Sequence, residues 1–317
     1  RLPRGRLSEQ DCGRWVVGAV SAPSIGRTVL TMSRRSLLSL AAGAVAPLAA
    51  ACSPLALMET LSPRDRGARR IAANIAYGAH ERQRLDLFAP VGDGTWPVVV
   101  FFYGGGWNSG SKDNYGWAAQ ALAAKGFLVA LPDYRLVPEV RFPHFIEDAA
   151  AATSHVQEIA GAHGGRPDRL AVGGHSAGAH LAMMIALDPR YLGAARAPDA
   201  IRAAFGISGP YEFLPFDVAS SINAFGQAPD PLQTQPITFA SADAPPLWLG
   251  HGTGDETVHS EDAELLAEAV NAAGGRAELE LYPGVDHATT IAAFSPLFRS
   301  RVSTLADVTA FLRRTLG

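Results

Sequence analysis

The sequence predicts an α/β fold with a mostly parallel central sheet and helices on both faces. From residue 74 onward, short apolar runs of strand length alternate with longer helical patterns. Such alternation is typical of parallel strands joined by right-handed crossovers. The chain has 317 residues, of which 48% are hydrophobic and 18% are charged. This composition can fill one large core, and it excludes a disordered chain or a coiled coil, both of which need more charge.

The first predicted elements follow one another closely. Residues Arg84–Phe88 alternate polar and apolar side chains, as a half-buried strand does. Residues Val98–Phe102 are a continuous apolar run that stops near three glycines, which indicates a strand buried on both faces. The alanine-rich segment Trp117–Lys125 is expected to be a helix, and Gly126 is expected to end it. Phe127–Leu131 is the next predicted strand.

The same alternation continues to the end of the chain. Residues 209–246 are rich in loop formers and too long for a plain connection, so we expect them to fold over the active-site end of the sheet. The remaining predicted helices are Phe145–Ala160, Ala177–Leu187, Ser260–Ala273 and Val302–Leu316, and the remaining strands are Leu170–Gly173, Ala203–Ile207, Leu247–Leu249 and Ala277–Leu281.

Charge divides the chain in two. Residues 1–73 contain 11 Lys and Arg against 4 Asp and Glu, whereas residues 74–317 contain 16 against 26. The acidic body excludes a nucleic-acid surface, which needs cations to replace counterions. We therefore divide the chain into an upstream or non-native start (1–31), a signal peptide (32–52), a tether (53–73) and one folded domain (74–317).

The predicted signal peptide carries an export pattern. Met32 is followed by two adjacent arginines and then by an apolar run, Leu37–Ala51, that is short for a membrane span. The arginine pair resembles a twin-arginine export signal. The run ends at Cys52 and resembles a bacterial lipobox, although Ala49 stands where leucine is usual. The expectation is an exported protein, periplasmic or attached to the membrane only through lipidated Cys52; the alternative is an ordinary cleavage site.

Cysteine usage limits the chemistry of the folded domain. The only cysteines, Cys12 and Cys52, precede it, so the domain has no disulfide framework, thiolate metal cluster or catalytic thiol. No HExxH pattern occurs either. We expect neither a metal nor a cofactor.

The strongest motif is Gly174-His175-Ser176-Ala177-Gly178, which matches G-x-S-x-G between a predicted strand and a predicted helix. A serine on so tight a turn has strained backbone angles, and bulky neighbours would clash there. The turn exposes the Ser176 hydroxyl at the helix N-terminus, where free N–H groups favour developing negative charge. Ser176 is therefore the candidate nucleophile.

A serine nucleophile needs a base, and in this motif's usual chain order the acid and then the histidine follow the serine. Three of the nine histidines come after Ser176 by a domain-scale interval: His251, His259 and His287. His287 lies in the loop expected directly after strand Ala277–Leu281, at the carboxyl end of that strand. It is therefore the candidate base.

The acid is expected on the loop after the preceding strand. That strand, Leu247–Leu249, leads directly to Asp255. Glu256 and Asp286 are alternatives, but Asp286 adjoins His287 in sequence, and so close a carboxylate rarely reaches the imidazole Nδ1. Asp255 is the candidate acid.

A glycine-rich segment, Tyr103–Trp107, follows the second predicted strand. Its three glycines let the backbone pass close to a substrate with N–H groups pointing inward, and the N–H of Ala177 is expected to add to them. A phosphate-binding loop is the alternative. Gly105 and Gly110 have its spacing, but Ser111 stands where that loop requires lysine, so this interpretation fails.

Together these motifs resemble α/β-hydrolase esterases of the hormone-sensitive-lipase-like and feruloyl/acetylxylan-esterase-like type. The resemblance implies an α/β-hydrolase catalytic domain over residues 74–317. In place of the family's usual histidine stands Tyr103, whose hydroxyl would brace the glycine loop from further away. The matching segments are Tyr103–Trp107, Asp133–Glu139 with Phe142-Pro143, Gly174–Gly178, His251–Val258 and Tyr282–His287. The site residues implied are the triad Ser176, Asp255 and His287, the oxyanion donors Gly105, Gly106 and Ala177, and the substrate contacts Trp107 and His175.

Other residues of these motifs are expected to be structural. Arg135 is expected to form an ion pair with Glu147 or Asp148, and Trp117 and Trp248 are expected in the core.

The main hypothesis is a serine carboxylesterase that hydrolyses small acyl esters, acetyl or feruloyl among them, through an acyl-enzyme. Its substrate would be a small molecule or an acylated polysaccharide. The alternatives are an arylformamidase-like amide hydrolase on the same site and, from another class, a non-catalytic surface lipoprotein with a hydrolase fold. The sequence does not define the acyl or alcohol specificity or the oligomeric state.

Overall fold

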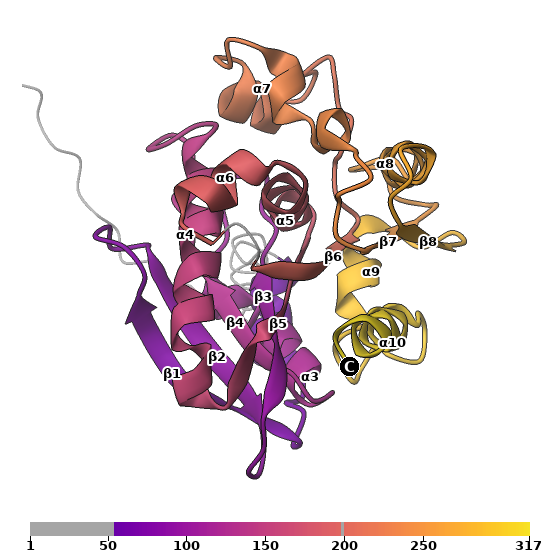
Figure 1. The fold of residues 1–317 in the computed structure, drawn as a ribbon. Coiled ribbons are helices and arrows are strands. Elements are labelled where there is room, and N and C mark those ends of the chain that lie inside the picture. Colours follow the sequence, from indigo (N-terminus) through magenta and orange to yellow (C-terminus); the bar gives the residue numbers. More distant parts are fainter. Residues whose placement is uncertain (1–53, 198–199) are drawn as a thin grey trace, which may run out of the picture. The chain divides into compact units, whose positions relative to one another are not determined.

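The computed structural model describes residues 54–197 and 200–317, with side chains from residue 58 onward (Figure 1). The described residues belong to a single compact unit, Cys52–Gly317. The predicted start 1–31 and signal peptide 32–52, Cys52 included, lie outside them. Among the described helices, none is both long and apolar enough to cross a membrane.

An eight-stranded sheet forms the centre of the fold, in the order β1-β2-β4-β3-β5-β6-β7-β8. Strand β2 is antiparallel to both β1 and β4, and all other pairs are parallel. The predicted α/β fold with a mostly parallel sheet is confirmed. The strands are β1 (Ala68–Ala76), β2 (Arg84–Pro90), β3 (Trp96–Phe102), β4 (Leu128–Pro132), β5 (Gly165–His175), β6 (Ile201–Ile207), β7 (Leu247–Gly252) and β8 (Ala277–Tyr282).

Strand order places the helices on the two faces of the sheet. The step from β3 to β4 runs in one direction along the sheet, and the steps from β4 to β5 and from β5 to β6 run in the other. Because crossovers are right-handed, α3 lies on the face opposite to α4 and α5. Helix α10 contacts α3, whereas α4 contacts α5 (Figure 1). The helices are α2 (Pro54–Leu61), α3 (Gly116–Ala123), α4 (His144–Ile159), α5 (Ala177–Leu187), α6 (Pro189–Ala194), α7 (Ala219–Phe225), α8 (Glu261–Ala272), α9 (His287–Ala292) and α10 (Thr304–Leu316).

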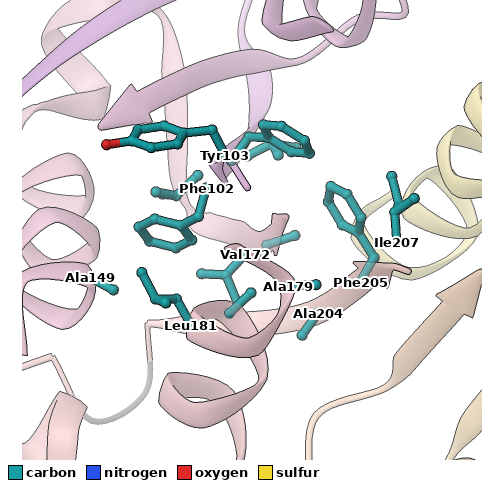
Figure 2. Packing of buried hydrophobic residues seen from close by; sticks show 14 of the residues in the cluster. Phe102, Tyr103, Ala149, Val172, Ala179, Leu181, Ala204, Phe205 and Ile207 are labelled. Carbon is teal, nitrogen blue, oxygen red and sulfur yellow. The ribbon is translucent and has the colours of Figure 1, made fainter. Parts of the chain in front are cut away.

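The core lies between the sheet and these helices. In Figure 2, Phe102 and Val172 from the central strands lie close to Leu181 of α5 and Ala149 of α4. All four are fully buried. Burying a Leu, Val or Phe side chain contributes about 1.5–3 kcal/mol each, so this layer holds β3 and β5 firmly and fixes the turns that follow them. Trp117 and Trp248 are buried as predicted.

The structure differs from the prediction at residues 53–73, which are not a plain tether. Helix α2 begins at Pro54, where the fixed backbone angle of proline suits a first helical turn, and β1 begins at Ala68. The Ser62 hydroxyl donates to Ser295 Oγ at 2.6 Å, and Arg299 pairs with Asp65 at 2.8 Å. Pro54, which with Pro63 and several arginines had indicated a tether, therefore begins a helix, and Ser62 and Asp65 contact the folded domain.

The loop after β4 is held as the sequence predicts. The Arg135 guanidinium donates to both carboxylate oxygens of Asp148, with Nη2–Oδ1 at 2.7 Å and Nε–Oδ2 at 2.8 Å. Asp148 is buried, so this bidentate pair is the partner predicted for Arg135. Glu147, the other candidate, instead contacts His144.

Candidate active site

The candidate nucleophile lies on a strained turn between β5 and α5. Ser176 has φ 55° and ψ −125°, a conformation that side-chain-bearing residues rarely adopt and that costs free energy. A Cβ on Gly178 would lie 2.1 Å from the carbonyl oxygen of Phe102, and one on Gly174 would lie 2.4 Å from the Gly178 backbone. Any larger residue at either glycine would therefore clash with backbone atoms, because the turn packs against the end of β3.

The candidate acid Asp255 follows strand β7, and the candidate base His287 follows the neighbouring strand β8. The His287 Nδ1 lies 2.7 Å from Asp255 Oδ2. The other oxygen of Asp255, Oδ1, accepts the N–H groups of Thr257 and Val258, both at 2.9 Å. Burial raises the pKa of Asp255, but hydrogen bonds from His251, His287 and the Val258 N–H outweigh it and hold that pKa well below its usual value. The carboxylate is therefore ionised at neutral pH.

The alternative acids lie elsewhere. Asp286 is the N-cap of α9, and its side chain accepts the Thr289 N–H at 2.8 Å. Glu256 is exposed at the rim of a pocket and is not the partner of His287. His287 itself is the first residue of α9 rather than a loop residue. The structure shows no hydrogen bond between its ring and the Ser176 hydroxyl, and such bonds often tighten only when substrate is present.

A second histidine contacts the same carboxylate, a role that the sequence analysis missed. His251 Nε2 lies 3.3 Å from Asp255 Oδ2 and 3.0 Å from the Val258 carbonyl oxygen, in a fully buried position. A ring N–H shared between these two acceptors fixes the position of Asp255. The signal was present in the sequence, because His251 lies four residues before Asp255 at the end of a buried strand.

His175 requires a correction, since it is buried and does not line the pocket. Its Nδ1 lies 3.0 Å from the Tyr115 hydroxyl, and its Nε2 lies 3.2 Å from the His287 carbonyl oxygen. Burial first, and then the charge of His287, lower the pKa of His175 to about 3, so the ring is neutral. Its place is beneath His287, where it supports that residue rather than contacting substrate.

The glycine loop after β3 lies against the nucleophile turn. A Cβ on Gly104 would come within 2.9 Å of Ser176 Cβ, and one on Gly105 would come within 2.2 Å of the Ser109 carbonyl oxygen. Gly105 and Gly106 have φ of 143° and 56°, which glycine adopts without strain. Within the described chain, no hydrogen bond is donated by the N–H groups of Gly105, Gly106 or Ala177. These groups are therefore free to bind an oxygen atom next to Ser176.

Tyr103 and an arginine that the sequence analysis missed brace this loop. Arg82 donates to the Tyr103 hydroxyl at 2.6 Å and to the Gly110 carbonyl oxygen at 3.0 Å, so it ties together both ends of the loop. The Tyr134 ring stacks on the Tyr103 ring at 4.7 Å, and its hydroxyl donates to the Tyr103 carbonyl oxygen at 3.0 Å. The buried Tyr103 hydroxyl and the glycine loop are thus held in place by hydrogen bonds from the charged Arg82.

A cavity of about 570 Å³ opens onto this turn. Ser176, Ala177, Gly106 and Trp107 form one side of it, and residues 210–221 form much of another. The prediction that the segment 209–246 covers the active-site end of the sheet is therefore confirmed. Its helix α7 lies at the top of the view in Figure 1, above α5. Trp107 lines the pocket, with its ring 6.0 Å from that of Phe213, and its contact with substrate stays a prediction. No described cluster of three or more His, Cys, Asp or Glu residues is arranged to hold a metal ion.

The chain is similar to a family model and to several known proteins. The BD-FAE family model matches residues 85–270. Isoprenylcysteine α-carbonyl methylesterase ICME of Arabidopsis thaliana is 30% identical over 242 residues, which cover 69% of this chain and 57% of the relative. Carboxylesterase NlhH of Mycobacterium tuberculosis is 32% identical over 219 residues, which cover 62% of this chain and 68% of the relative. The chain thus spans less than two thirds of ICME.

The chain is also similar to solved structures of esterases. Esterase 2 of Thermogutta terrifontis, at 26% identity, superposes with a TM-score of 0.64 over 80% of this chain and 96% of its own. The family model covers more than half of the chain, and the sheet order and turn geometry match the fold expected from the motifs. The chain therefore belongs to the BD-FAE family and is an α/β-hydrolase of the esterase type.

Proposed function

We propose that this protein hydrolyses carboxylic esters with Ser176 as nucleophile, His287 as general base and Asp255 as the residue that orients His287. One observation carries the proposal. The hydrogen-bonded His287–Asp255 pair follows two adjacent strands at the same sheet edge where β5 presents Ser176 on its strained turn. Carboxyl ends of parallel strands meet at one edge, which is where open α/β sheets bind ligands.

In the proposed reaction, Ser176 Oγ attacks the ester carbonyl carbon while His287 Nε2 takes the hydroxyl proton. The N–H groups of Gly105, Gly106 and Ala177 stabilise the negative oxygen that forms. The C–O bond to the alcohol then breaks, and the alcohol leaves with the proton from His287. Water, deprotonated by His287, attacks the acyl-enzyme, and the carboxylic acid and free Ser176 result. Asp255 stays ionised throughout and balances the charge of the imidazolium.

Small acyl groups, acetyl and feruloyl among them, are the proposed acyl part. A cavity of about 570 Å³ is of the size that holds small-molecule ligands. Support also comes from Thermogutta terrifontis esterase 2, which is 26% identical to this chain and was solved with propionate bound. The whole substrate is proposed to be a small-molecule ester or an acylated polysaccharide.

A fluorophosphonate probe tests this function directly, because it forms a covalent bond only with an activated serine. We expect stoichiometric labelling of the folded chain at Ser176, together with hydrolysis of p-nitrophenyl acetate. Mass spectrometry of the digested protein locates the label. Absence of labelling would favour a non-catalytic protein, and faster cleavage of a matched anilide than of the ester would favour an amide hydrolase.

We also propose that Cys52 is lipidated and anchors the enzyme after export. The support is the arginine pair and apolar run of residues 34–51 directly before that cysteine. Expressed from the native gene in a bacterium, the activity should be found in the membrane fraction and be released by detergent but not by salt. The Cys52→Ser variant should lose this behaviour. Wild-type activity confined to the soluble periplasmic fraction would show that Cys52 is incidental.

A further inference from the structure

The pocket next to Ser176 has an unusual charge balance. Four carboxylic acids line it, namely Glu212, Asp217, Glu256 and Asp262, and no lysine or arginine is among the described residues that line it. By contrast, three other cavities of the described chain each contain at least one arginine. The acidic composition is therefore a property of this pocket rather than of every hollow on an acidic protein.

The charges of these carboxylates are not cancelled locally. None of the four forms an ion pair with another described residue, whereas the neighbouring Asp255 pairs with His287 and His251. Asp262 is buried, and its Oδ1 accepts the N–H groups of Tyr211 and Glu212 at 2.6 and 2.7 Å. Asp262 therefore stabilises the backbone conformation of the segment 209–246 near its start. The exposed Glu212, Asp217 and Glu256 leave a negative potential at the pocket.

Aromatic rings add to this potential. Trp107 and Phe213 line the same pocket, with ring centroids 6.0 Å apart and planes inclined by 25°. Phe213 is half-buried, whereas Trp107 is only 4% exposed, so Phe213 is the ring of this pair that is more open to a ligand. The faces of aromatic rings attract cations, and such faces combined with nearby carboxylates suit an ammonium group. Both features favour the same kind of ligand, and both belong to the cavity that contains the nucleophile.

We propose that this pocket selects esters that carry an ammonium group. The inference rests on the proposed esterase function and adds the charge of its preferred substrate. Carboxylates at a pocket raise the local concentration of cations and stabilise a bound cation, while they repel anions. The same potential favours release of the product, since hydrolysis generates a carboxylate beside Glu212, Asp217 and Glu256. Charge that acts on substrate and transition state alike is expected to lower KM more than it changes kcat.

The test compares pairs of esters that differ only in charge. Acetylcholine, the acetate ester of choline, is paired with its carbon isostere, in which a quaternary carbon replaces the ammonium nitrogen. A second pair places the same groups at the end of the acyl chain of a p-nitrophenyl ester. For at least one pair, we expect kcat/KM to be about tenfold higher for the cationic ester at low ionic strength and the ratio to fall as salt is added.

The triple variant Glu212→Gln, Asp217→Asn, Glu256→Gln should bring that ratio close to one. Because the two esters of a pair have nearly the same shape, their ratio cancels any general loss of active enzyme. A matched control, Glu81→Gln, Asp93→Asn, Glu268→Gln, removes three exposed carboxylates that lie outside the pocket. It changes the net charge equally and should leave the ratio unchanged.

Two results would overturn the proposal. One is a ratio near one for both pairs in the wild type; the other is an equal loss of the ratio in the control variant, which would make the effect one of net charge. In either case continued hydrolysis of the neutral esters would leave the esterase function standing. If no ester is hydrolysed and the fluorophosphonate does not react, the proposed function itself fails.

Discussion

Replacing Ser176 with alanine is expected to reduce the hydrolysis of p-nitrophenyl acetate by at least about 10⁴-fold. The hydroxyl oxygen is the only non-hydrogen atom lost, and without it no acyl-enzyme can form. The oxyanion donors remain, so a small residual rate above that of water is expected. The measurement is kcat/KM with the purified variant, combined with the loss of fluorophosphonate labelling.

The fold should be unaffected by this change. Ser176 is an N-cap whose side chain makes no capping hydrogen bond, and alanine must adopt the same φ of 55°. The melting temperature should therefore stay within a few degrees of the wild type. Ser303→Ala, at an exposed serine before α10, is the matched control and should keep full activity. More than a few per cent of wild-type activity in the Ser176→Ala protein would remove Ser176 from the mechanism.

Much of this site could be predicted because each of its parts is a local pattern at the end of a strand. The G-x-S-x-G turn needs only five adjacent residues, and its glycines are explained by contacts within that turn and with β3. Asp255 and His287 could be placed because each lies a few residues after the end of a predicted strand, and the carboxyl ends of parallel strands meet at one edge. The sheet order then brings together residues that the chain separates.

The rest depends on contacts that no local pattern encodes. Arg82 lies 21 residues from Tyr103, on the approach to β2, and only the antiparallel placement of β2 beside β4 brings its guanidinium under the glycine loop. His175 was expected to contact substrate, as the resemblance to esterases implied. In a strand end, however, successive side chains point to opposite sides, and that of His175 points into the protein. The helix at residues 54–61 was missed because Pro54 and Pro63, which lie at its start and just after its end, are typical of a linker.

Replacing Asp255 with asparagine is expected to reduce kcat/KM by about 10³–10⁴-fold. The carboxylate accepts hydrogen bonds on both oxygens, from Thr257 and Val258 on one and from His251 and His287 on the other. An amide has only one oxygen. Turned toward the two backbone N–H groups, it presents its NH₂ to His287 Nδ1, which must then become an acceptor. The proton moves to Nε2, and the ring can no longer take the proton of Ser176.

The matched control is the neighbouring carboxylate that the sequence also allowed as the acid. Asp286 caps α9 through the Thr289 N–H, and asparagine is an equally good N-cap, so Asp286→Asn should cost less than about threefold in kcat/KM. Each variant removes one negative charge near His287: Asp286 precedes it in the chain, and Asp255 contacts its ring. Net charge therefore cannot explain a difference in activity between the two variants. A large loss in Asp286→Asn with near-normal activity in Asp255→Asn would mean that the loop after β7 does not supply the acid.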